Sequence, residues 1–145
     1  MKTSSFFTYL KTALQGVKLD LTTYLFGSNV YIVPVFPLEQ INLFPSRCCF
    51  IIDAGANPHE FHPHIQSQAF TVGFFAEDIR DPFGEVAIQN CITIDEILHN
   101  FMLSIKSLNS EKVLIRLNSK TTATTIRNNY PLLVRYWVYD ALTEV

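Results

Sequence analysis

An apolar stripe at helical spacing constrains the fold of this 145-residue chain more than any other feature. It runs from Phe83 to Ile105 and follows Asp81-Pro82, which is typical of a helix start because Asp caps the first turn and proline suits the first helical position. Directly before it, residues 66–76 (QSQAFTVGFFA) alternate apolar side chains with small or polar ones, as a strand with one buried face does. A strand followed by a long amphipathic helix predicts helices packed against a sheet.

Further elements are expected on both sides of this pair. Apolar side chains at helical spacing predict a helix over residues 5–17. A short β-branched run predicts an edge strand or an extended crossing over 30–36, because Pro34 cannot donate a ladder hydrogen bond. Runs of the same kind predict further strands over residues 47–54, 112–117 and 132–139.

The connections are predicted from turn residues and polar residues. We expect the long helix to end at Asn109-Ser110. Residues 92–94 are poor helix formers, so the helix can kink or break there. Residues 54–64 are expected to form a long loop, and the threonine-rich residues 121–125 a polar connection.

The predicted fold class is α+β, a two-layer sandwich. Its sheet is expected to be mainly antiparallel with four to five strands, with the N-terminal helix and the long central helix on one face. The length supports a single domain over residues 1–145. With 48% hydrophobic and 17% charged residues the chain is not expected to be disordered. No apolar run reaches the roughly 18 residues of a membrane span, so we expect neither secretion nor membrane association.

The charge is small and unevenly distributed. The net charge of −2 and the pI of about 6.0 argue against a nucleic-acid binder. Residues 1–100 contain five basic and ten acidic side chains, whereas residues 101–145 contain six basic and three acidic ones. This is either chance variation or a sign of two oppositely charged patches, which would suit head-to-tail contacts between identical subunits.

The three cysteines, Cys48, Cys49 and Cys91, show neither a disulfide framework nor a zinc-binding spacing. We predict reduced, buried side chains in a cytoplasmic setting.

A histidine-bearing segment, residues 57–64 (NPHEFHPH), is a candidate metal site or projecting loop. Imidazoles at such short spacing can bind zinc or nickel, and a histidine cluster can sense pH. Pro63, however, fixes the backbone between two histidines, and a fourth ligand would have to come from elsewhere. We therefore predict an exposed loop without a native metal. The residues expected to project are Asn57, His59, Glu60, His62 and His64.

Acidic pairs offer little for catalysis. The neighbours in Glu77-Asp78 and in Asp95-Glu96 diverge in regular structure, so they do not form a catalytic dyad. We expect Asp95-Glu96 on a solvated helix face and the other pair near a helix start. The sequence has neither a glycine-rich phosphate loop nor a nucleophile motif. We therefore predict that the protein is not an enzyme and binds no cofactor.

Arg135, Trp137 and Tyr139 share one face of the last expected strand. One interpretation is a central strand covered on both sides, with Arg135 near an edge. The other is an exposed contact face, because Arg, Trp and Tyr are enriched at interface hot spots. Our hypothesis is that these three residues form a subunit or ring–ring interface.

Four segments follow one another in a recognisable order. They are the opening helix, a proline-containing segment ending in NLFPSRCCFIIDAG, the strand-to-helix run QSQAFTVGFFAEDIRDPFGE, and the closing LLVRYWVYDAL strand. This order resembles the tail terminator (tail-tube capping) proteins of long-tailed bacteriophages. In that family an acidic corner and a long helix follow the strand after the loop, as in residues 70–85 here. The likeness spans residues 5–142.

The resemblance implies a structural virion protein. It would form a homohexameric ring on the last ring of the tail tube, end tube polymerisation and offer the surface for head–tail joining. The implied partners are further copies of itself, the tail tube protein and the head-closure or connector protein of the neck. Genome DNA would pass through the lumen without specific binding. The implied location is the virion, after assembly in the host cytoplasm.

Two other functions stay open at this point. The chain could be another neck component, a head-closure or connector protein, which would not cap tube ends. It could also be a small enzyme or metal-dependent binding module that uses the loop from His59 to His64.

Overall fold

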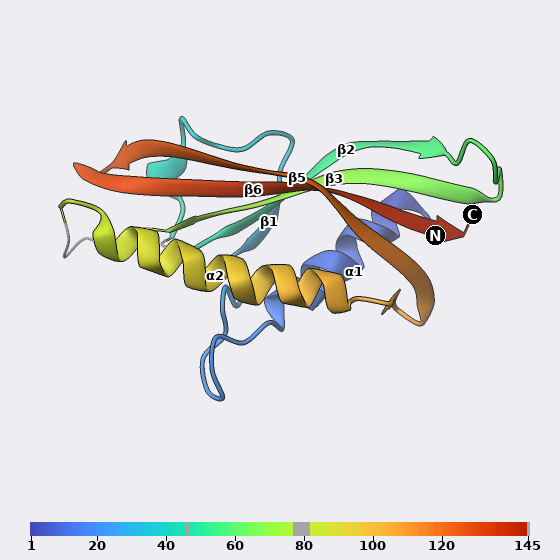
Figure 1. Ribbon diagram of the computed structural model, residues 1–145, viewed down its shortest axis with the longest axis horizontal. Coiled ribbons are helices and arrows are strands. Elements are labelled where there is room, and N and C mark those ends of the chain that lie inside the picture. Colours follow the sequence, from blue (N-terminus) through green and yellow to red (C-terminus); the bar gives the residue numbers. More distant parts are fainter. Residues whose placement is uncertain (46, 77–81, 145) are drawn as a thin grey trace.

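The computed structural model describes residues 1–45, 47–76 and 82–144, which form a six-stranded sheet and two α-helices in two layers (Figure 1). In chain order the elements are α1 (Thr3–Gln15), β1 (Val30–Ile32), the short 3₁₀ helix η1 (Ile41–Leu43), β2 (Cys49–Pro58), β3 (Ile65–Ala76), α2 (Glu85–Ser104), β4 (Ser107–Leu108), β5 (Glu111–Arg127) and β6 (Tyr130–Glu144). The predicted α+β class is confirmed, although the sheet has more strands than expected.

The sheet is mixed, with strand order β1-β2-β3-β6-β5-β4. β1 runs parallel to β2, and every other neighbouring pair is antiparallel. β1 lies at an edge, as Pro34 predicts. β3 and β6 occupy the centre, and their long register brings Phe70 opposite Tyr139 and Val72 opposite Trp137.

Both helices cover the same face of the sheet, below it in Figure 1. The core between the layers is rich in aromatic rings. Phe70 stacks on Tyr139 with ring centroids 5.4 Å apart, and Phe74 lies 5.4 Å from Trp137. The helices contribute Phe6, Phe7, Leu10 and Leu14 from α1 and Ala87, Cys91, Leu98 and Met102 from α2. These side chains recur at helical spacing, so burying one stripe of each helix completes the core.

The opposite face of the sheet is partly covered by the segment that connects β1 to β2. A second apolar cluster there includes Ile41 of η1, Phe50 of β2 and Phe75 of β3. Phe36 lies directly on the sheet because Gly73 has no side chain. A Cβ on Gly73 would lie 2.7 Å from a carbon of the Phe36 ring. Chain outside the helices therefore buries part of the second face.

The threonine-rich residues 121–125 lie within β5, so the prediction of a polar connection there is wrong. β5 and β6 form one long hairpin that closes at Asn128 and Asn129, with φ of 51° and 68°. Two consecutive positive φ values form the hairpin turn that matches strand twist, and asparagine tolerates them. Threonine is polar but β-branched, and it packs well in a strand.

The long helix is shorter than predicted. α2 ends at Ser104, and Asn109-Ser110 forms the turn between β4 and β5, where both residues have positive φ. α2 is continuous through residues 92–94. At the other end the helix begins at Glu85 after Gly84, so the expected start at Pro82 is wrong by one turn. Glu77, Asp78 and Asp81 lie outside the described residues.

The expected long loop over residues 54–64 is mostly strand. β2 continues to Pro58 and pairs with β3 up to the register pair Pro58–Gln66. A hairpin tip of residues 59–64 remains. None of the described helices is long and apolar enough to cross a membrane.

Replacement of Trp137 by alanine tests the core. We expect Trp137→Ala to lower the free energy of unfolding by about 3–5 kcal/mol, because a fully buried ring is removed and leaves a cavity. Urea titration followed by circular dichroism measures the change. Leu21→Ala is the control, since Leu21 is 94% exposed and should change stability by less than about 0.5 kcal/mol. Equal effects of the two substitutions would contradict this core.

Candidate functional site

The interface predicted from the last strand is wrong for two of its three residues. Trp137 and Tyr139 are fully buried within the chain, under the helices. Burial is the main cause that raises the pKa of the Tyr139 hydroxyl. The three residues do share one face of β6, but the helices cover the part of this face that carries Trp137 and Tyr139.

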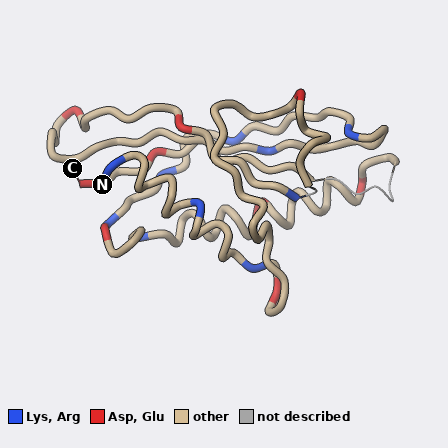
Figure 2. Tube along the Cα trace, turned by 180° about the vertical axis from the view of Figure 1, so that it is seen from behind, with Lys and Arg blue, Asp and Glu red and all other residues tan. Residues whose placement is uncertain are grey.

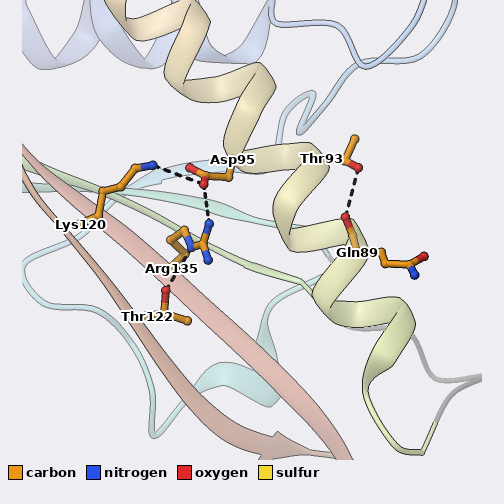
Figure 3. A network of polar contacts seen from close by, with 6 residues as sticks. All are labelled: Gln89, Thr93, Asp95, Lys120, Thr122 and Arg135. Atoms are coloured by element: carbon orange, nitrogen blue, oxygen red, sulfur yellow. Dashed lines mark hydrogen bonds and ion pairs between the residues drawn. The ribbon is translucent and has the colours of Figure 1, made fainter.

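Arg135, the third residue, joins a polar network between α2 and the β5–β6 hairpin (Figure 3). Its guanidinium donates a hydrogen bond to the Asp95 carboxylate and another to the Thr122 hydroxyl at 3.1 Å. The Lys120 ammonium lies 3.5 Å from the same carboxylate oxygen of Asp95. Asp95 is buried, so its expected place on a solvated helix face is wrong, whereas the neighbouring Glu96 is exposed.

This network fixes α2 relative to the hairpin. Charge-assisted hydrogen bonds are stronger than neutral ones, and a partly buried carboxylate needs its cations. The Arg135 side chain is 22% exposed and that of Asp95 is 11% exposed, whereas the Lys120 side chain is 44% exposed. Arg135 is therefore the main partner that holds Asp95 over the sheet.

β5 has a long unpaired edge. On one side it pairs with β6, and on the other β4 reaches only Glu111 and Lys112. A further backbone bond joins Val113 to Lys106. From residue 114 to residue 126, no strand of the described chain pairs with this outer edge. An open edge presents free backbone donors and acceptors, which makes it a template for another strand.

One flank of α2 lies beside this edge. Ile88, Ile92 and Asp95 are spaced by four and three residues, so they share one side of the helix. Because Asp95 contacts Lys120 of β5, that side faces β5. Ile88 and Ile92 are nevertheless 47% and 45% exposed.

Two more exposed apolar side chains lie at the hairpin end. Ile126 pairs with Pro131, and a Cβ on Gly84 would lie 3.1 Å from Pro131. The start of α2 therefore lies near the hairpin tip, with Phe83 90% and Ile126 70% exposed. We call the free edge of β5 (residues 114–126) together with Phe83, Ile88 and Ile92 the β5 edge surface.

Charge distinguishes the β5 side of the molecule from the β2–β3 side. β5 contains four basic residues and one acidic residue, whereas residues 48–76 contain Asp53 and Glu60 and neither Lys nor Arg. In Figure 2 the charged positions are sparse, with long uncharged stretches between them. The charge asymmetry of the sequence is therefore also an asymmetry between the two sides of one sheet.

The histidines lie at the tip of the β2–β3 hairpin, while Asn57 belongs to β2. The ring centroids of His59 and His62 are 5.2 Å apart, and those of His62 and His64 are 6.0 Å apart. His59 Nδ1 accepts a hydrogen bond from the Phe61 N–H at 3.2 Å. Within the described ranges, no group of three or more His, Cys, Asp or Glu residues is placed so that it could hold a metal ion.

An apolar groove of about 250 Å³ lies on the face opposite the helices. It is lined by the apolar side chains of Phe36, Leu38, Ile52, Ala123, Val134 and Val138, with Thr71 and Tyr136 as polar neighbours. Such a lining suits contact with apolar side chains better than catalysis, which requires several convergent polar groups.

Comparison with protein family models found no match, and comparison with curated proteins found none either. The function must therefore be inferred from the residues and their geometry.

Two signals in the sequence could have revealed the β5 edge surface. The run of β-branched residues before Asn128-Asn129 is a strand followed by a two-residue turn. Asp95 lies four residues after Cys91 and three before Leu98, both on the buried stripe, so its burial follows from helical spacing.

Removal of Arg135 tests the network. We expect Arg135→Met to lower the free energy of unfolding by about 1–3 kcal/mol, because the Asp95 carboxylate loses its main partner. Lys120→Met should cost less than about 1 kcal/mol, since Lys120 is much more exposed. Urea unfolding of both variants gives the comparison, and a larger loss for Lys120→Met would contradict the assigned roles.

Thiol reactivity tests the cysteines, which are buried and form no disulfide, as predicted. Burial raises the pKa of both Cys49 and Cys91, so the reactive thiolate is scarce as well as shielded. At pH 8 we expect the folded protein to react slowly with an aromatic disulfide reagent and the urea-unfolded protein to react quickly at all three cysteines. Fast reaction of folded protein would show that these side chains are accessible.

Proposed function

We propose that this chain is a structural subunit of a bacteriophage virion. It assembles as a homohexameric ring that caps the tail tube, ends tube polymerisation and provides the surface for head–tail joining. The observation that carries the proposal is the β5 edge surface, where a long unpaired strand edge adjoins exposed isoleucines. The resemblance of the sequence to tail terminator proteins supplies the specific role.

Protein contact is the use that fits this surface best. An unpaired edge offers main-chain hydrogen bonds, and the neighbouring apolar side chains offer area to bury. Arg116 and Lys120 are charged positions of the edge, whereas residues 121–126 carry no charge. Natural monomers commonly protect such edges with several charges, a proline or a covering loop. The uncharged stretch from residue 121 to residue 126 is therefore suited to a partner.

Identical partners arranged head to tail fit the charge distribution. A closed ring uses heterologous contacts, in which one patch meets a different patch of the neighbour. The basic β5 side and the acidic β2–β3 side are two such patches on one subunit. The low charge of the subunit also suits a lumen through which DNA passes without being held by its phosphates.

Solution mass tests the ring. By light scattering after size exclusion, we expect a species of six times the 16.6 kDa chain mass, growing from monomer as concentration rises. Ile92→Lys should shift the protein to the monomer because it places a charge in the apolar part of the β5 edge surface. Leu21→Lys, in the exposed connection between α1 and β1, is the matched control.

Each result has a distinct meaning. A monomer at every concentration contradicts the ring. A ring that leaves the length distribution of polymerising tail tubes unchanged contradicts the capping role and favours a head-closure or connector protein of the neck. A ring that shortens the tubes and appears at their ends supports the full proposal.

A further inference from the structure

The sheet has a second unpaired edge, on the side opposite β5. β1 pairs with β2 only at Cys49, Phe50 and Ile51, and the Val33 N–H extends this contact with one more bond to Ile51. From residue 52 to residue 58, no described strand pairs with the outer side of β2. The two open edges therefore belong to opposite sides of the same sheet.

The directions of the two strands permit a ring. Three successive antiparallel pairings lead from β2 through β3 and β6 to β5, so β2 and β5 run in opposite directions. A rotation about an axis roughly along the strands keeps these directions. It would bring β2 of the next copy antiparallel to β5, which is the more stable kind of pairing.

Composition and charge of the β2 edge suit this partner. Ala54, Gly55 and Ala56 are small and exposed, so a neighbouring strand can approach closely. The seven open positions are enough for a strand of ordinary length. Attraction between the basic β5 and the acidic β2–β3 hairpin would orient the two copies before they pair.

We propose that the subunits join by strand pairing, in which the open edge of β5 in one copy binds the open edge of β2 in the next. The six-stranded sheets then form one continuous sheet around the ring. This inference rests on the proposed ring and names its contact. It also gives each subunit a use for the open edges of both β5 and β2.

Crosslinking between two singly substituted proteins tests the pairing. Leu114→Cys on β5 and Asn57→Cys on β2 introduce exposed thiols. The register relates both positions to Ser67 of β3, so they lie on the same sheet face and at the same level along the strands. A short bifunctional maleimide tolerates uncertainty in register, and the three native cysteines are buried.

We expect the mixed pair to give a covalent heterodimer severalfold more abundantly than the pair of Thr8→Cys with Asn57→Cys. Thr8 is exposed on α1, in the helix layer and not on either open strand edge, and serves as the matched control. Unequal tags on the two proteins identify the heterodimer by mass.

The outcomes separate this inference from the ring itself. A ring-sized mass with no more heterodimer than the control overturns the strand pairing and leaves the ring. A monomer without crosslinks overturns both. Ala56→Lys provides a measurement independent of cysteine, because a lysine on the β2 edge should block pairing and convert the ring to monomer. A ring retained by Ala56→Lys counts against the proposal, with Thr8→Lys as control.

Discussion

Burial of aromatic rings between the central strands and the two helices is the interaction on which the rest of the structure depends. Phe70, Phe74, Trp137 and Tyr139 come from β3 and β6, and all four are fully buried. Large rings contribute much of the apolar area in a core of this size. Because these rings lie on one face of the sheet, both helices pack on that face over the central strands. The helices therefore bury less of the peripheral strands.

The polar network and the open edge both follow from this arrangement. β6 begins before the buried aromatic residues, and Arg135 lies in this first part of the strand, where the helix-facing side meets solvent. Asp95 of α2 neutralises it and holds the helix beside the β5–β6 hairpin. α2 therefore presents Ile88 and Ile92 next to a strand edge that nothing in the described chain pairs. The apolar surface and the backbone edge form one continuous region for that reason.

A long open edge is a hazard for a monomer, because it can pair with any extended chain. Assembly into a closed ring removes the hazard and uses the edge for a defined contact. The proposed capping role and the proposed strand pairing draw on the same two features, the open edges and the opposite charges of the two sides. They can fail separately, since a ring can also close through side-chain contacts alone.

The sequence by itself determined the α+β class, the strand over residues 66–76 and the buried stripe of α2. These are local periodicities, which each segment carries within its own residues. Only the tertiary structure decided which sheet face received the helices and therefore that Trp137 and Tyr139 are core. It also decided that residues 121–125 extend a strand. Strand pairing and the choice of face depend on residues distant in the chain, so no local pattern determines them.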